Sequence, residues 1–80
     1  EWAMTESVIT EVDACGLDCP MPLLKAKRAL NALDSGQRLR VLATDSGSRR
    51  DFQVFAEQSG HLLLDSAENN GVFSYLLEKR

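Results

Sequence analysis

The five glycines of this chain stand where its hydrophobic pattern changes, and this punctuation restricts the fold more than any other feature. Some segments between them carry apolar residues at every second position, a pattern typical of strands. Others repeat apolar residues every three or four positions, which is typical of helices that bury one face. The order of these segments therefore predicts the order of the secondary-structure elements.

Four segments are expected to form strands, and they span residues 7–14, 38–44, 61–68 and 72–79. In the first, Val8 and Val12 alternate with polar neighbours until Gly16 breaks the pattern. In the second, one face carries three apolar residues, Leu39, Val41 and Ala43. The last two strands are joined at Asn69-Asn70-Gly71, because asparagine and glycine best tolerate the positive φ angles of a tight hairpin turn.

The first predicted helix begins at Pro20 or Pro22, because proline is tolerated in the first helical turn, where its missing N–H costs nothing. Met21 precedes a proline and so resists helical angles, which favours a start at Pro22. Gly36 is expected to end this helix in the left-handed conformation. The apolar stripe of the helix consists of Leu23, Ala26, Leu30 and Leu33.

A second helix is predicted to start at Ser48. Ser48 and Asp51 have the S-x-x-D spacing of a capping box, in which the two side chains bind the free amides of a helix start. Gly60 is expected to stop the helix. The buried face of this helix is formed by Phe52, Phe55 and Ala56.

The resulting β-α-β-α-β-β order predicts a two-layer α/β sandwich, with both helices on one face of a four-stranded mixed sheet. The first β-α-β unit is expected to be parallel and right-handed. The opposite face of the sheet would then meet solvent, and its apolar side chains could form an interaction surface or simply be scattered surface residues. The residues expected on that face are Leu42 and Leu63, with either Phe73 and Tyr75 or Val72 and Leu76.

At 80 residues the chain accommodates one domain, which is expected to cover residues 5–80. Residues 1–3 are interpreted as remnants of recombinant expression, with Met4 as the native start. No apolar run approaches the roughly 18 residues needed to span a bilayer, and no secretory signal is recognisable at the start. A cytoplasmic location, without membrane contact, is therefore expected.

Charge gives a weaker indication of the partner. The net charge is -3 and the nine basic residues are dispersed, so no direct nucleic-acid contact is expected. Lys25, Lys27 and Arg28 nevertheless lie close together after the prolines, and Arg49 with Arg50 forms a second pair. These residues either form a solvated helix face or provide a docking patch for an acidic partner protein.

Cys15 and Cys19 are the residues whose chemistry stands out. With the single histidine, His61, they fall short of the four ligands of a structural zinc site, so neither a metal nor another cofactor is expected. Cys19 is placed at a helix N-terminus, where free amides and the helix dipole favour a thiolate, but the neighbouring Asp18 opposes it. The sign of the net pKa shift of Cys19 stays open at this point.

Cys15 and His61 have weaker claims to a chemical role. Cys15 stands at the end of a predicted strand, where a packed residue is expected; the alternative is a redox or sulfur-relay partnership with Cys19. His61 begins a strand beside a glycine, and it is expected to be structural or solvated, with proton donation as the alternative.

The segment GLDCPMP, residues 16–22, resembles the Gly-Leu-x-Cys-Pro-x-Pro signature of the TusA/SirA-like sulfur-carrier family. The resemblance extends over nearly the whole chain. The family fold is similar to the C-terminal domain of translation initiation factor 3, with the same order of elements. In addition to Gly16, Leu17, Cys19, Pro20 and Pro22, the matching positions are Asp13, Asp45 in VLATD, Asp51, Phe55 and Gly60-His61.

The resemblance implies that Cys19 accepts a sulfane sulfur from a donor protein, such as a cysteine desulfurase or a rhodanese, and holds it as a persulfide. The sulfur then passes to an acceptor protein. In one branch of the family this ends in thiolation of a transfer RNA wobble uridine; other branches are tied to sulfur oxidation or molybdenum-cofactor assembly. Such a sulfurtransferase acts as a protein-bound relay rather than as a turnover enzyme. Lys25, Lys27 and Arg28 would then lie on the docking face.

The chain departs from the common family pattern at a few positions. Ser46 stands where proline is frequent and Ala56 where a cysteine is frequent, and Asp18 and Cys15 also differ from the commoner residues of their loop. Two other classes of function stay open: a thiol-disulfide module that uses the Cys15/Cys19 pair, and a nucleic-acid or regulatory binding module.

Overall fold

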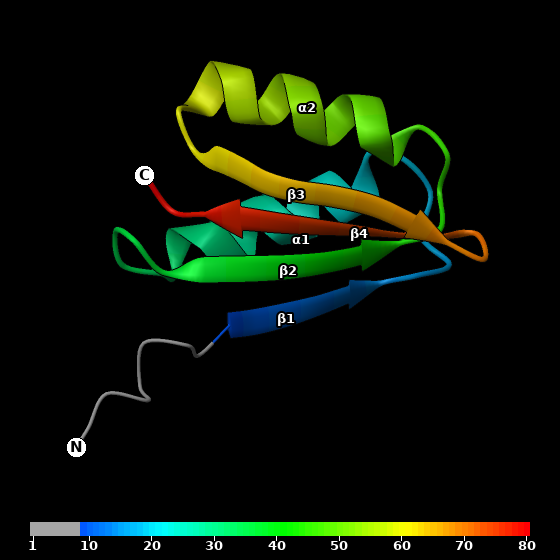
Figure 1. The fold of residues 1–80 in the computed structure, drawn as a ribbon, viewed down its shortest axis with the longest axis horizontal. Helices are drawn as coiled ribbons and strands as arrows, with labels where there is room; N and C mark the ends of the chain where they lie inside the picture. Colours follow the sequence, from blue (N-terminus) through cyan, green and yellow to red (C-terminus); the bar gives the residue numbers. More distant parts are fainter. Residues whose placement is uncertain (1–8) are drawn as a thin grey trace.

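The computed structural model describes residues 9–80 and confirms the predicted order of elements. Residues 1–3, Met4 and the first two positions of the predicted first strand lie outside the described residues. Figure 1 shows the arrangement of the six elements. They are β1 (Ile9–Ala14), α1 (Met21–Asn31), β2 (Arg38–Ala43), α2 (Ser48–Ser59), β3 (Leu62–Asn69) and β4 (Val72–Glu78).

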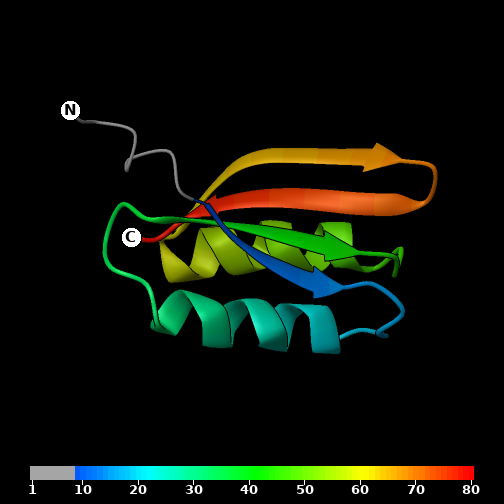
Figure 2. The same ribbon diagram turned by 90° about the horizontal axis from the view of Figure 1, so that it is seen from below.

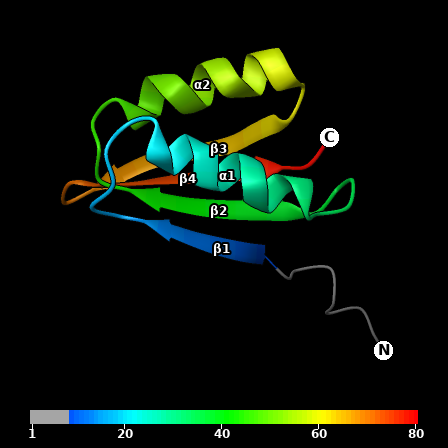
Figure 3. The same cartoon turned by 180° about the vertical axis from the view of Figure 1, so that it is seen from behind.

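The four strands form one mixed sheet in the order β1-β2-β4-β3. β1 and β2 are parallel, whereas β4 is antiparallel to both β2 and β3. Both helices cover the same face of this sheet, so the molecule has two layers (Figure 2). The predicted fold class is therefore confirmed. The loops that follow β1 and β2 lie at the same end of the molecule, because the two strands are parallel (Figure 3).

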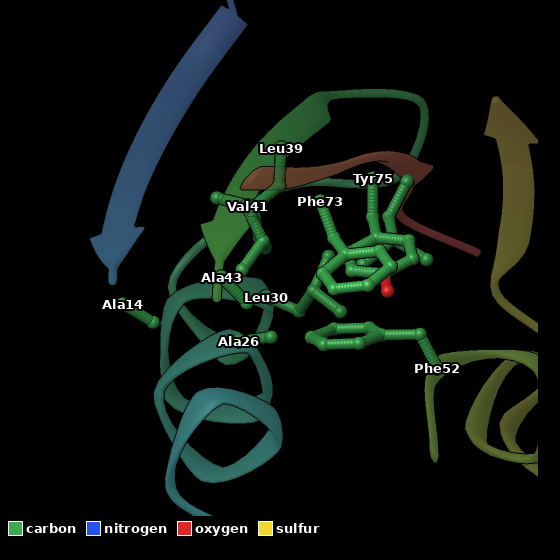
Figure 4. Close-up of a cluster of buried hydrophobic side chains, with 10 residues drawn as sticks. Ala14, Ala26, Leu30, Leu39, Val41, Ala43, Phe52, Phe73 and Tyr75 are labelled. Atoms are coloured by element: carbon green, nitrogen blue, oxygen red, sulfur yellow. The ribbon is translucent and has the colours of Figure 1, made fainter. Parts of the chain in front are cut away.

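The hydrophobic core lies between the sheet and the helices (Figure 4). Alternate residues of β2 and β4 point into it, as the period of a strand requires. Phe52 of α2 is stacked on Tyr75 of β4, with 4.6 Å between the ring centroids. The buried hydrophobic residues are Ala14, Ala26, Leu30, Leu39, Val41, Ala43, Phe52, Phe73, Tyr75 and Leu77.

The strand register decides which apolar residues face away from the core. Leu42 is paired with Ser74, so it shares the outer face with Val72 and Leu76 rather than with Phe73 and Tyr75. The expectation for Leu63 is wrong: it is paired with the buried Leu77 and packs against the core. The outer face also carries polar contacts, Arg40 to Ser74 at 3.0 Å and Arg38 to Glu78 at 3.2 Å, so it is less apolar than expected.

Helix α1 starts and ends earlier than predicted. It begins at Met21 rather than at Pro22, because the Leu24 N–H donates to the Pro20 carbonyl at 3.0 Å and closes the first turn there. It ends at Asn31, five residues before Gly36. Gly36 does have a positive φ of +87°, but it lies in the turn before β2, where its N–H donates to the Lys79 carbonyl at 2.9 Å. The predicted glycine cap of α1 is therefore wrong.

Two other turn predictions are confirmed. Gly60 ends α2 in the left-handed conformation, with φ +84°, and its N–H donates to the Ala56 carbonyl at 3.1 Å. Asn70 and Gly71 have φ +53° and +81° and form the hairpin turn between β3 and β4.

The predicted capping box at the start of α2 does not form. The helix begins at Ser48 after Gly47, and no side chain binds its free amides. The Ser48 hydroxyl instead shares a hydrogen bond of 2.7 Å with the buried Tyr75 hydroxyl, because a buried phenol needs a polar partner. The Ser48 N–H donates to the Asp45 carbonyl at 3.1 Å. The Asp51 carboxylate is consequently free of any capping role and points elsewhere.

Candidate functional site

Cys19 is exposed on the loop between β1 and α1. It stands directly before Pro20, which occupies the N-cap position of α1. Two residues at the start of this loop, Gly16 and Leu17, fix its position. Gly16 has φ +82°, and its N–H donates at 2.8 Å to Oγ1 of Thr44, the residue directly after β2. Leu17 is partly buried against the core. Cys19 is thus presented to solvent by a loop that is anchored to the neighbouring strand.

The thiol of Cys19 is held by a carboxylate from the other helix. Its Sγ donates a hydrogen bond of 2.7 Å to Asp51 Oδ2, in the first turn of α2. This bond, followed by desolvation and by the negative charges of Asp51 and Asp45, raises the pKa of Cys19 above its ordinary value. The shift whose sign the sequence left open is therefore upward, and the resting group is a thiol.

Asp45 is the second acidic residue of this site. It lies on the loop between β2 and α2, and its Oδ2 is buried without a hydrogen-bond partner among the described residues. The same oxygen lies so close to Gly47 that a Cβ added there would be 3.1 Å from it. Asp45 also contributes a smaller increase to the pKa of Tyr75, which burial raises most strongly. The tertiary structure thus brings both Asp45 and Asp51 to Cys19.

Cys15 is exposed, so the expectation of a packed residue is wrong. The Asp13 carboxylate accepts the Cys15 N–H at 3.0 Å, and this bond lowers the pKa of Asp13. A hydrogen bond to the same carboxylate raises the pKa of the Cys15 thiol. Both cysteines are free thiols in the structure, and each is paired with its own carboxylate.

His61 lies away from these two cysteines, beyond the C-terminal end of α2, whereas Asp51 is in the first turn of that helix. Its Nδ1 accepts the Arg80 N–H at 3.0 Å, and its ring lies 5.6 Å from the Phe55 ring. Burial lowers the pKa of His61, so the ring is neutral and can accept this bond at pH 7. His61 therefore has Arg80 as its hydrogen-bond partner and contacts neither cysteine in the described part of the chain.

A groove of about 200 Å³ runs between the two helices and includes Asp51, the partner of Cys19. Of the three basic residues proposed for docking, Lys27 lines this groove, with its Nζ 5.6 Å from the centre of the Phe55 ring. Lys25 instead lies close enough to Asp13 for its charge to lower that pKa, and Arg28 is exposed in the last turn of α1. The lining residues are Leu23, Lys27, Arg50, Asp51, Val54, Phe55 and Gln58.

Val54 and Gln58 belong to this groove but were not among the predicted site residues, and Arg50, the third, was named in the sequence only as one of a basic pair. Their spacing of four residues places them on one side of α2, as the helical period requires. That periodicity was visible in the sequence, but it does not tell which exposed face of the helix borders a groove.

Among residues 9–80 no group of three or more histidine, cysteine or acidic side chains is placed to hold a metal ion. Within the same part of the chain, neither helix has the length and apolar character that a membrane span requires.

Fold and site together define a small two-layer α/β protein that presents a cysteine thiol at the start of its first helix, beside an inter-helix groove. Residues 10–79 match the family model described as sulfurtransferase TusA. The chain belongs to this family, which confirms the resemblance noted in the sequence.

Individual relatives agree with this assignment. The chain is 54% identical to the sulfur carrier protein TusA of Allochromatium vinosum over 69 residues, which cover 86% of this chain and 91% of the relative. It is 40% identical to the putative sulfur carrier protein YrkI of Bacillus subtilis over 68 residues, 85% and 91% of the two chains. The crystal structure of a SirA-like protein from Desulfitobacterium hafniense is similar with a TM-score of 0.77 and 33% identity, covering 89% of this chain and 96% of that one.

Proposed function

We propose that this protein carries sulfane sulfur as a persulfide on Cys19, from a donor protein to an acceptor protein. The observation that carries the proposal is the exposure of Cys19 on an anchored loop beside a groove, in a family whose relatives are named sulfur carrier proteins. An exposed thiol can reach the reactive sulfur of a partner, and a fixed loop reduces the entropy lost when the two dock. A cytoplasmic setting would keep both cysteines available as thiols.

The transfer itself exchanges one S–S bond for another. Cys19 Sγ attacks the terminal sulfur of a donor persulfide, and the bond between that sulfur and the donor cysteine breaks. The donor leaves as a thiol, and Cys19 becomes the persulfide, so no external oxidant is required. A cysteine desulfurase or a rhodanese fits the role of donor, and another sulfur-relay protein fits that of acceptor, with transfer RNA thiolation as one destination. The protein acts as a relay rather than as a turnover enzyme.

The proposal is tested by loading the protein with sulfur. The reduced chain, incubated with a cysteine desulfurase and L-cysteine, should gain the mass of one sulfur atom, and a reductant should remove it. Intact-mass spectrometry measures both changes. No gain of sulfur with several desulfurases and rhodaneses as donors would contradict the carrier function. An intramolecular disulfide formed reversibly under mild oxidation, with no persulfide, would instead indicate a thiol-disulfide module.

The donor is expected to dock over the groove between α1 and α2. Lys27 and Arg50 give this groove two positive charges next to apolar Leu23, Val54 and Phe55. An acidic donor surface would be attracted to it, because complementary charge mainly accelerates association. The docking patch predicted from the sequence is thus revised to Lys27 with Arg50.

Reversing both charges, Lys27→Glu with Arg50→Glu, should slow loading from the desulfurase by roughly tenfold at low salt. Loading from glutathione persulfide, which needs no docking, should change little. The matched pair Lys25→Glu with Arg28→Glu should slow desulfurase loading less, because neither residue lines the groove. Initial rates from intact mass at two salt concentrations measure the effect. Equal losses in both pairs would contradict a docking site in the groove.

A further inference from the structure

The bond between Cys19 and Asp51 joins residues that are 32 positions apart in the sequence. At 2.7 Å from Sγ to Oδ2, the thiol is the donor and the carboxylate is the acceptor, so the sulfur carries the proton before reaction. A thiol is a poor nucleophile, since the thiolate is the attacking form. Any transfer of sulfur to Cys19 must therefore first remove this proton, and Asp51 Oδ2 already accepts it in a hydrogen bond.

The Asp51 carboxylate is available to accept the Cys19 proton because the Ser48 N–H, its expected partner, already has another acceptor. In a capping box it would bind the Ser48 N–H, but that N–H donates to the Asp45 carbonyl at 3.1 Å. The Asp51 N–H is itself satisfied by the Gly47 carbonyl at 3.2 Å, which holds the residue in the first helical turn. The first turn is also a favourable position for a negative charge. The carboxylate is thus directed at Cys19 by the backbone of α2.

We propose that Asp51 is a catalytic residue of sulfur transfer, whose carboxylate takes the proton from Cys19 as Sγ attacks the terminal sulfur of a donor persulfide. This inference rests on the proposed carrier function. The new S–S bond forms on Cys19 Sγ, the donor S–S bond breaks, and Asp51 passes the proton to the departing donor sulfur. The carboxylate is then restored. In unloading, an acceptor thiol attacks the persulfide, and its proton returns through Asp51 to Cys19 Sγ.

Other charged groups face this pair from the surrounding elements. Asp45 from the β2–α2 loop adds negative charge near Cys19, and Lys27 of α1 and Arg50 of α2 line the groove with Asp51. Asp18 lies next to Cys19 in the sequence. Asp51 differs from all of them because it is the one in hydrogen-bond contact with the reacting sulfur among the described residues. Geometry, rather than charge alone, therefore assigns the role of proton acceptor to Asp51.

The test is Asp51→Asn, made together with Cys15→Ser so that Cys19 is the only thiol. Asparagine keeps the shape of aspartate but cannot take a proton. Two rates are measured at pH 7 by intact mass: alkylation by iodoacetamide and loading from glutathione persulfide. Alkylation releases iodide, which needs no proton, so it should become faster, because loss of the negative charge lowers the pKa of Cys19. Loading differs because the departing donor sulfur takes the proton that Asp51 passes on. Loading should become slower by roughly 100-fold, the lower end of general acid-base contributions.

Asp18→Asn is the matched control, since it removes a nearby charge that makes no contact with Sγ in the structure; loading should stay within about twofold of its parent. Asp51→Glu should restore part of the loading rate, because glutamate can accept a proton. Equal or faster loading in Asp51→Asn would overturn the proposal, as would a decrease in both rates. If the Cys15→Ser parent gains no sulfur from the probe or from any protein donor, the carrier function itself fails. Normal loading of both the parent and Asp51→Asn would instead contradict only the role of Asp51.

Discussion

Cys19→Ser should abolish sulfur loading entirely. Cys19 supplies the only sulfur that the structure places both at the start of α1 and in contact with Asp51, among the described residues. A serine hydroxyl cannot form a persulfide, and at neutral pH it is a far weaker nucleophile than a thiol. Intact-mass analysis after incubation with a cysteine desulfurase and L-cysteine should therefore show no added sulfur.

Cys15→Ser provides the matched control. It changes the same atom type four positions earlier in the same loop, and it should keep most of the loading, because Cys15 has its own partner in Asp13 and no contact with Asp51 in the structure. If Cys15→Ser removed loading as completely as Cys19→Ser, the two cysteines would act together. That result would contradict a carrier that uses Cys19 alone and would favour a relay or a disulfide.

Phe52→Ala should destabilise the fold by about 3 to 5 kcal/mol, the usual cost of removing a buried aromatic ring. Phe52 has no exposed surface and is stacked on Tyr75, so it joins α2 to the centre of the sheet. A domain of this size has a total stability of roughly 5 to 15 kcal/mol, so the variant should be partly unfolded at room temperature if the parent lies at the low end of that range. Urea unfolding followed by circular dichroism measures the free energy of unfolding.

Val54→Ala is the control on the same helix. Val54 is 40% exposed, so truncation should cost less than about 1 kcal/mol. A loss for Phe52→Ala as small as that for Val54→Ala would show that α2 does not depend on this ring. The comparison matters for function, because α2 also carries Asp51. A destabilised α2 would reduce sulfur loading indirectly.

Much of the fold could be predicted because its signals are local. The alternation of Leu39, Val41 and Ala43 predicted a strand with one buried face, and the three residues are fully buried. Asn70 and Gly71 predicted the hairpin, since few residues tolerate positive φ. The boundaries of α1 were less accurate, because Gly36 serves a turn rather than the helix end.

The predictions that failed concern the start of α2 and the residue that follows β1. The S-x-x-D spacing of Ser48 and Asp51 predicts a capping box, but Ser48 is drawn to the buried Tyr75 hydroxyl, and Asp51 to Cys19. Cys15 was expected to be packed because it stands at the end of a strand, but it lies in the turn directly after β1 and is exposed. For Ser48 and Asp51 the deciding partners are distant in sequence, whereas Cys15 is exposed just beyond the last residue of β1.

The sequence by itself determined the family, the order of the elements and the position of Cys19 at a helix start, because these depend on motifs and on hydrophobic period. Only the tertiary structure decided the protonation state of that cysteine. The loops after β1 and β2 meet because the two strands are parallel, and this brings Asp51 and Asp45 to Cys19. Coulomb interactions and hydrogen bonds act through space over a few ångströms, so a carboxylate 32 positions away in the sequence raises the pKa of Cys19.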